Sequence, residues 1–150
     1  MNLYVDTGAL IKNYIRETSS DQVIELLSCH SFIGTAALTQ AEMASAMTKA
    51  RRLGWVEEAD IEAAWQDFIS HWASFIRLPL STRNVEQAAA LCWRYGLRAY
   101  DAIHLASALT WKGVGGDEVI FACFDQALHK SSSQRRVAGL ACRIAGPYRS

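Results

Sequence analysis

The sequence lacks an excess of charge of either sign, since 15 Lys and Arg residues balance 15 Asp and Glu residues over its 150 positions. Such a chain is not expected to bind nucleic acid through a strongly basic overall charge, although a local basic rim around an acidic pocket is compatible with the count. No apolar run approaches the about 18 residues that a membrane-spanning helix needs, and no basic-then-apolar secretory signal opens the chain. These absences predict a soluble, cytoplasmic protein with no membrane association.

The chain also lacks the cysteine and glycine patterns of several large enzyme classes. Its four cysteines form no Cys-x-x-Cys pair and have no zinc-like spacing. Because they lie among apolar neighbours, we expect buried, reduced thiols at Cys29, Cys92, Cys123 and Cys142. No Gly-x-Gly-x-x-Gly motif or P-loop is present, which argues against a nucleotide-cofactor enzyme. No linker, repeat or low-complexity tract interrupts the sequence, so we expect a single domain over residues 1–150.

Short apolar segments alternate with segments of helical periodicity along the whole chain. We expect strands at residues 2–5, 31–36, 76–80, 119–124 and 139–145, the last as an edge strand. We expect helices at residues 7–16, 22–29, 38–53, 57–75, 82–95, 99–111 and 125–130, with a glycine-rich break at 113–116. This alternation is typical of a mainly parallel sheet with helices on both faces, an α/β architecture.

Four acidic residues stand where such a sheet places ligands, beyond the carboxyl ends of its strands. Asp6 and Asp125 directly follow predicted strands, and Glu42 and Asp101 lie in the first turns of predicted helices. Each has a purely structural alternative: Asp6 and Asp125 as N-caps, Glu42 as the capping-box partner of Thr39, and Asp101 as a partner of the helix dipole.

A cluster of all four acids would have chemical consequences. Carboxylates within a few ångströms of one another must share a cation or hold a proton. Oxygen ligands suit Mg²⁺ or Mn²⁺, and such an ion lowers the pKa of a bound water and stabilises charge as a phosphodiester breaks. The pattern therefore points to metal-dependent phosphodiester hydrolysis.

Segments 4–10, 35–42, 98–108 and 121–128 resemble the four acidic motifs of PIN-domain nucleases, and their order is most similar to that of VapC-type toxins. The resemblance implies a three-layer α/β/α sandwich with a mainly parallel four- to five-stranded sheet. It implies an Mg²⁺- or Mn²⁺-dependent endoribonuclease, the toxin of a type II VapBC-like pair, with a VapB-like antitoxin as partner and a homodimeric state. The catalytic and metal-site acids it implies are Asp6, Glu42, Asp101 and Asp125, with Thr7 in support.

Two positions depart from the family pattern. Cys123 stands two residues before Asp125, where the family often has Thr or Ser, and a thiol is the poorer hydrogen-bond partner. Gly8 stands where the family often has Ser. The departure at Cys123 bears on the detailed role of Asp125.

Several further residues have two interpretations each. His104, three residues after Asp101, is favoured as a histidine packed beside the apolar stripe over a group acting in the site. Contacts to RNA phosphates are the functional interpretation of four basic residues, and solvated charges at helix ends are the alternative: Lys12, Arg51, Arg52 and Arg98.

The Trp-rich helix over residues 57–75 forms a predicted hairpin with the preceding helix. The resemblance to VapC-type toxins implies that apolar surface near this hairpin and the first helices docks the antitoxin. Two rival functions keep the same fold. One is a catalytically inactive PIN-like module that binds RNA or protein, and the other is a housekeeping RNA-processing PIN nuclease.

Overall fold

The computed structural model describes residues 2–115, 118–123, 136–137 and 140–144. Its strands are β1 (Asn2–Val5), β2 (Ile33–Ala36), β3 (Ile76–Leu78), β4 (Val119–Cys123), β5 (Arg136–Val137) and β6 (Leu140–Ile144). Its helices are α1 (Thr7–Leu10), the 3₁₀ turn η1 (Ile11–Asn13), α2 (Ser20–Ser28), α3 (Thr39–Arg52), α4 (Glu58–Trp72), α5 (Thr82–Tyr95) and α6 (Ala99–Gly115). The helix expected over residues 125–130, and Asp125 with it, lie outside the described residues.

The strands form one sheet in the order β3-β2-β1-β4-β6-β5. All neighbours from β3 to β6 pair in parallel, and only β5 pairs antiparallel. The expected mainly parallel sheet is confirmed. The expectation of an edge strand over 139–145 is wrong, because β6 pairs with β4 on one side and with the two-residue β5 on the other. A strand as short as β5 leaves no periodicity for sequence analysis to detect.

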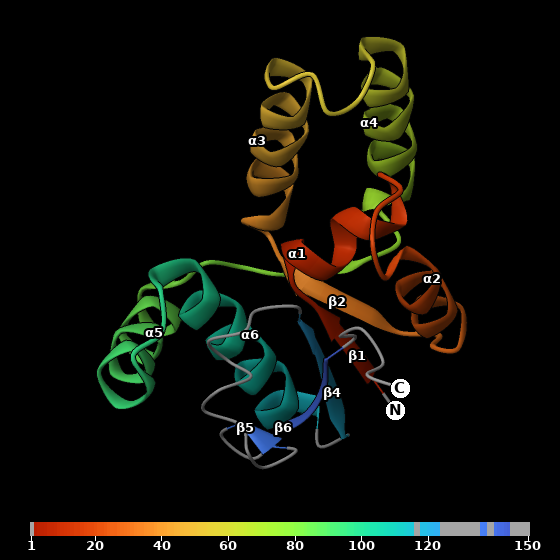
Figure 1. Cartoon of the computed structure of the whole chain (residues 1–150). Helices are drawn as coiled ribbons and strands as arrows, with labels where there is room; N and C mark the ends of the chain where they lie inside the picture. The colour runs from red at the N-terminus through yellow and green to blue at the C-terminus, as the bar shows by residue number, and fades with distance from the viewer. Residues whose placement is uncertain (1, 116–117, 124–135, 138–139, 145–150) are drawn as a thin grey trace, which may run out of the picture.

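Side chains of the central strands alternate between two apolar cores, one on each face of the sheet. Leu3 and Val5 of β1 pack with residues of α1, α3 and α4. Tyr4, between them, packs with Phe121 of β4 and with residues of α5 and α6. Figure 1 shows α5 and α6 grouped on one side of the sheet and α1 to α4 on the other. Because successive side chains of a strand point to opposite faces, each face of the sheet has its own core and its own layer of helices. The expected three-layer α/β/α sandwich is confirmed.

Gly34 in β2 is required by the helix layer above it. A Cβ atom at this position would lie 2.4 Å from the indole ring of Trp111 on α6. No real side chain tolerates that distance, so only glycine lets α6 approach β2 with this indole between them.

Two predicted helices have different ends in the structure. The helix expected over residues 7–16 is shorter, because α1 tightens after Leu10 into η1 and the backbone then turns away. The helix expected over 99–111 is longer, because α6 continues through Gly113 to Gly115. Glycine lowers helix stability without forbidding a helix, and the added turn is exposed, with Val114 85% exposed.

The prediction of four buried thiols is correct only for Cys123 among the described side chains. Cys29 is exposed and Cys92 is half-buried, and the side chain of Cys142 lies outside the described residues. Cys29 caps the C-terminal end of α2, where the helix leaves the core. The apolar sequence around Cys29 therefore did not predict correctly whether its side chain is buried.

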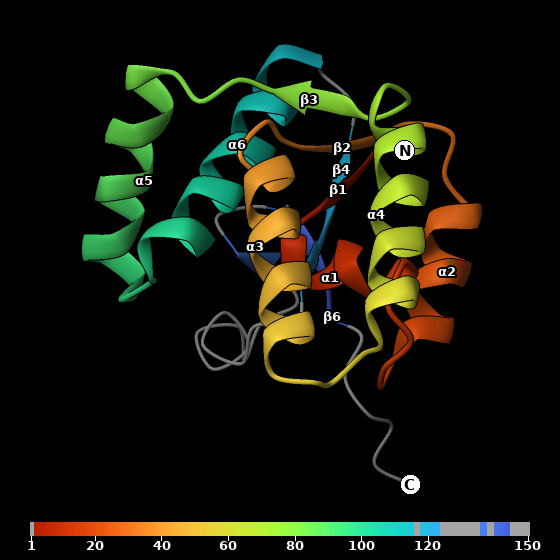
Figure 2. The ribbon, with the colours of Figure 1, turned by 90° about the horizontal axis from the view of Figure 1, so that it is seen from above.

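Helices α3 and α4 form a hairpin that projects beyond the sheet (Figure 1), and α1 lies between them in the view of Figure 2. The expected apolar stripe of α4 is confirmed, since Ile61, Ala64 and Phe68 are buried and Trp65 and Trp72 pack against the same core. No helix within the described ranges is both long and apolar enough to span a membrane.

Candidate active site

Asp6 connects the end of β1 to the start of α1 and is buried, with 7% of its surface exposed. Its Oδ1 accepts a hydrogen bond from the Ala9 amide at 2.7 Å, so the carboxylate caps α1. Its own backbone N–H donates to the Ala122 carbonyl of β4 at 3.2 Å. The structural interpretation of Asp6 as an N-cap is therefore correct, and the same contacts fix its carboxylate at the end of the central strands.

Glu42 reaches the same place from the first turn of α3. The Thr7 hydroxyl donates to Glu42 Oε2 at 2.5 Å, and His104 Nε2 lies 2.7 Å from the same oxygen. The capping-box interpretation of Glu42 and Thr39 is wrong, because the N-cap of α3 is Leu38, whose side chain makes no capping hydrogen bond.

The Thr39 hydroxyl instead pairs with Thr35 Oγ1 at 2.7 Å, and Thr35 donates to the Val5 carbonyl at 2.7 Å. Both threonines are fully buried. These two hydroxyls hold the start of α3 against the ends of β1 and β2, and so place Glu42 beside Asp6.

Asp101 lies in the first turn of α6, with 17% of its side chain exposed. Arg98 Nε donates to Asp101 Oδ2 at 2.9 Å. The Asp101 carboxylate lies near enough to Asp6 for its negative charge to raise the pKa of Asp6. Asp6, Glu42 and Asp101 thus lie near the same edge of the sheet, close enough for the charges of Glu42 and Asp101 to act on Asp6.

The pKa values of Asp6 and Glu42 are shifted in opposite directions. Burial raises the pKa of Asp6 to about 6; the charges of Asp101 and Glu42 add to this effect, and His104 and the Ala9 amide oppose it. Burial also acts to raise the pKa of Glu42, but hydrogen bonding with His104 and Thr7 outweighs it and the pKa is lowered. The site therefore holds one firmly ionised carboxylate beside one that resists ionisation.

His104 and Tyr4 are members of the site that sequence analysis did not assign to it. His104 is buried, as the favoured interpretation expected, yet its ring contacts Glu42 directly. Tyr4 lies on the same face of β1 as α6, and its hydroxyl is 2.9 Å from His104 Nδ1. The sequence does place both residues inside the acidic motifs, since Tyr4 lies two residues before Asp6 and His104 lies three residues after Asp101.

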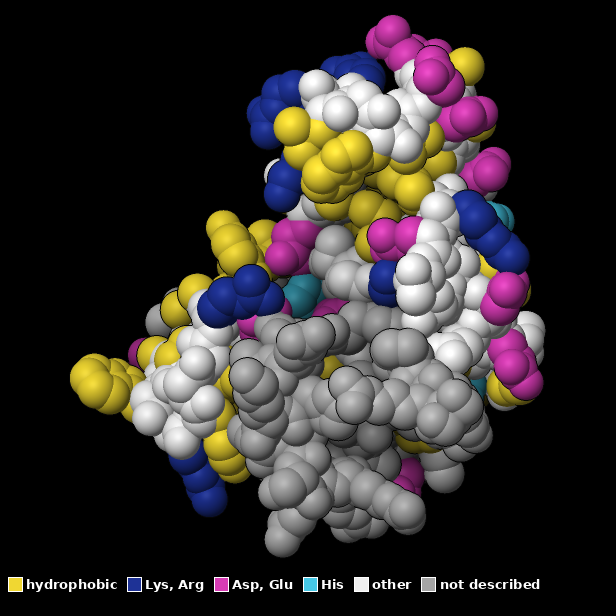
Figure 3. All heavy atoms as spheres, viewed as in Figure 1, with side chains coloured by type: hydrophobic (Ala, Val, Ile, Leu, Met, Phe, Trp, Pro, Cys, Tyr) yellow, Lys and Arg dark blue, Asp and Glu magenta, His cyan; other side chains and the backbone are white. Residues whose placement is uncertain are grey.

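The four basic candidates are spread over the molecule. Arg98 is at the site, paired with Asp101. Lys12 pairs with Glu17 at 2.8 Å. Arg51 pairs with Glu58 at 3.6 Å, and with Arg52 it lies at the far end of α3, roughly 14 Å along the helix from Glu42. Figure 3 shows Lys and Arg side chains gathered over the α3 side of the hairpin and Asp and Glu over the α4 side.

The donor set at the site suits a hard divalent cation. It consists of carboxylate oxygens, and the pKa of Asp6 is raised chiefly by its burial, with a smaller contribution from the negative charges of Asp101 and Glu42 that a cation would offset. Within the described part of the chain, no three His, Cys, Asp or Glu side chains are grouped tightly enough to hold a metal ion as they stand.

Comparisons with known proteins identify the family of the chain. The sequence matches the PIN domain model over residues 3–127. It is 32% identical to ribonuclease VapC45 of Mycobacterium tuberculosis over 95% of this chain and 94% of that protein.

Two solved structures share the fold. They are FitAB bound to an IR36 DNA fragment, with a TM-score of 0.67, 16% identity and coverage of 95% and 94% of the two chains, and VapBC2 from Rickettsia felis bound to a promoter DNA fragment, with a TM-score of 0.64, 12% identity and coverage of 97% and 100%. The resemblance found in the acidic motifs is confirmed, and the chain belongs to the PIN domain family.

Proposed function

We propose that this chain is a Mg²⁺- or Mn²⁺-dependent endoribonuclease and the toxin of a type II toxin–antitoxin pair. The observation that carries the proposal is the buried Asp6 carboxylate, which lies within electrostatic reach of both Glu42 and Asp101. The ribonuclease relative and the toxin–antitoxin complexes among the structural neighbours support RNA as substrate and an antitoxin as partner.

Asp6, Glu42 and Asp101 are the residues that would hold the cation, together with Asp125. A bound divalent ion supplies Lewis acidity, which lowers the pKa of a water molecule and stabilises negative charge on a phosphate. Asp6 is fixed by the Ala9 amide, and Glu42 is held by Thr7 and His104. These contacts restrict the Asp6 and Glu42 carboxylates before substrate arrives, which lowers the cost of orienting them for the reaction.

Arg98 is the basic residue best placed for the scissile strand, because it lies beside Asp101 with 76% of its side chain exposed. We propose that Arg98 exchanges its ion pair with Asp101 for an RNA phosphate, which releases that carboxylate oxygen toward the cation. Phosphate contacts by Lys12, Arg51 and Arg52 would extend the binding surface and make affinity salt-dependent.

The test of catalysis is incubation of the purified chain with total RNA in Mg²⁺, Mn²⁺ or EDTA, followed by mapping of the cleaved ends. We expect cleavage with metal, none with EDTA, and loss of cleavage in Asp6→Asn and Asp101→Asn. Asp21→Asn, an exposed position on α2, is the matched control and should cleave normally. Cleavage that persists in both site variants would refute the assignment, and a chain that binds RNA without cutting it would favour the inactive-module alternative.

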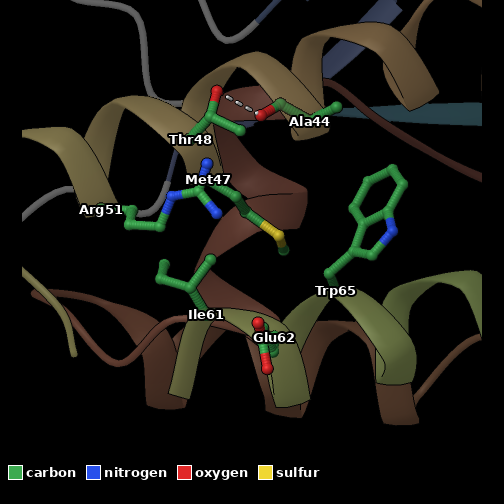
Figure 4. Close-up of a pocket in the computed structure, with 7 residues that line it drawn as sticks. All are labelled: Ala44, Met47, Thr48, Arg51, Ile61, Glu62 and Trp65. Atoms are coloured by element: carbon green, nitrogen blue, oxygen red, sulfur yellow. Dashed lines mark hydrogen bonds between the residues drawn. The ribbon is translucent and has the colours of Figure 1, made fainter. Parts of the chain in front are cut away.

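The α3–α4 hairpin is the surface we assign to the antitoxin. Between the two helices lies a pocket of about 160 Å³, whose apolar lining comes from Ala44, Met47, Ile61 and Trp65 (Figure 4). On the other side of α4, Trp55 stands 68% exposed and lines a hollow of about 550 Å³ together with Tyr14. The apolar pocket and the exposed Trp55 are the kind of surface that marks a protein contact, although charged side chains such as Glu57 and Asp60 also line the hollow.

The docking assignment is tested with the product of a short gene next to that of this chain. We expect Trp55→Ala and Thr48→Glu to weaken the complex in a pull-down or calorimetric titration. Trp93→Ala is the matched control, since Trp93 is 90% exposed but lies on α5. Equal affinity of all three variants and the unchanged chain would show that the antitoxin binds elsewhere.

A further inference from the structure

A buried chain of hydrogen bonds leads from the core to Glu42. Tyr4 and His104 are 0% and 3% exposed, and their rings meet edge to face with centroids 6.0 Å apart. His104 Nδ1 lies 2.9 Å from the Tyr4 hydroxyl, and His104 Nε2 lies 2.7 Å from Glu42 Oε2. One imidazole thus bridges a phenol of β1 and a carboxylate of α3, although it belongs to α6.

The contacts constrain which ring nitrogen of His104 carries a proton. A carboxylate oxygen only accepts hydrogen bonds, so His104 Nε2 must be the donor to Glu42. In a neutral imidazole the other nitrogen is then an acceptor. The Tyr4 hydroxyl, 2.9 Å from His104 Nδ1, is the group placed to donate to that nitrogen.

We propose that Tyr4 and His104 are positioning residues that fix the Glu42 carboxylate for the divalent cation. Tyr4 holds His104 in the tautomer protonated at Nε2, and His104 in turn holds Glu42 Oε2 beside the hydroxyl of Thr7. The inference rests on the proposed function, because it assigns the two residues a role in cation binding.

A packing role alone predicts a different outcome. Buried polar atoms need partners in any core, so removal of the Tyr4 hydroxyl could lower stability without touching Glu42. In the positioning role, the same change frees the imidazole to adopt either tautomer, and only one of them donates to Glu42. The tautomer and the metal affinity therefore separate the two roles, whereas the melting temperature does not.

The first experiment records the nitrogen shifts of ¹⁵N-labelled histidine in the metal-free chain. We expect His104 protonated at Nε2 alone in the unchanged protein, and a mixture of tautomers in Tyr4→Phe. Tyr14→Phe is the matched control, because the Tyr14 hydroxyl lies 3.3 Å from His71 Nδ1 at an exposed pair. A proton on His104 Nδ1 in the unchanged protein, or an unaltered tautomer in Tyr4→Phe, would overturn the proposal.

The second experiment titrates each variant with Mn²⁺ by calorimetry. Tyr4→Phe and His104→Leu should weaken binding about 10-fold or more, as loss of a residue that orients a metal ligand does. His104→Gln, whose terminal amide retains a donor near the place of Nε2, should stay within about 3-fold, and adding Tyr4→Phe to it should cost nothing more.

The experiments distinguish failure of the positioning role from failure of the proposed nuclease function. Tyr4→Phe that binds Mn²⁺ as tightly as Tyr14→Phe refutes the positioning role and leaves the proposed nuclease standing. Absence of Mn²⁺ binding by the unchanged chain refutes the cation-dependent function and the positioning role with it. The tautomer of His104 in the metal-free protein is read in either case.

Discussion

Replacing Asp6 by asparagine is expected to stabilise the metal-free protein near neutral pH while abolishing its nuclease activity. The reason is the buried carboxylate, whose pKa lies at about 6 in the folded chain against an ordinary value of 3.8. That difference corresponds to about 3 kcal/mol of stability lost by ionising Asp6 in the fold. Asparagine removes the charge and remains a good N-cap, so the hydrogen bond to the Ala9 amide has a replacement.

The sign of the pH dependence follows from proton binding. Below about pH 4 Asp6 is protonated in both states, and the asparagine variant gains little. As the pH rises from 3.8 to about 6 the unfolded chain loses its proton first, so the stability contributed by protonated Asp6 is progressively lost. The advantage of Asp6→Asn therefore grows through this window and is constant above it.

The assay is thermal unfolding of both proteins in EDTA between pH 4 and 8. For a chain of this length, 1 kcal/mol corresponds to about 2–4 °C, so the variant should melt roughly 6–12 °C higher at pH 7.5. Asp21→Asn is the control for net charge and should show no such advantage. Added Mn²⁺ should raise the melting temperature of the unchanged chain only. A variant less stable than the unchanged chain at pH 7.5 would refute the reasoning.

Three further outcomes follow from single contacts. Gly34→Ala should lower the free energy of unfolding by about 1–3 kcal/mol in urea, because the new Cβ meets Trp111; Gly113→Ala, which meets nothing within 4 Å, should not. Thr7→Val keeps the shape but removes the donor to Glu42, so Mn²⁺ affinity should fall about 10-fold, and an unchanged affinity would contradict that role of Thr7. Arg98→Gln should weaken RNA binding and flatten its salt dependence, as measured by filter binding at several salt concentrations; an unaltered salt slope would exclude a phosphate contact.

Three sequence-based expectations stay predictions. The homodimer was implied by the family resemblance alone, and the cytoplasmic location by the absence of a signal or membrane segment. Asp125 also stays a predicted site residue, because it lies outside the described part of the chain.

The layered fold was predictable because its signals are local and repeated. The apolar pattern within each strand or helix indicates which of its faces is buried. The alternation of strands and helices along the chain predicts the parallel sheet. What failed were features decided by partners distant in sequence. The pairing of β6 on both sides and the exposure of Cys29 depend on what lies against each segment.

The sequence by itself determined which acids stand at the carboxyl ends of strands and the first turns of helices, since Asp6, Glu42 and Asp101 belong to motifs of fixed spacing. Only the tertiary structure decided what surrounds them. Tyr4, Thr7 and His104 are separated by up to 100 positions from their hydrogen-bond partners. The pKa of a carboxylate depends on distance and burial in space, neither of which any local pattern encodes.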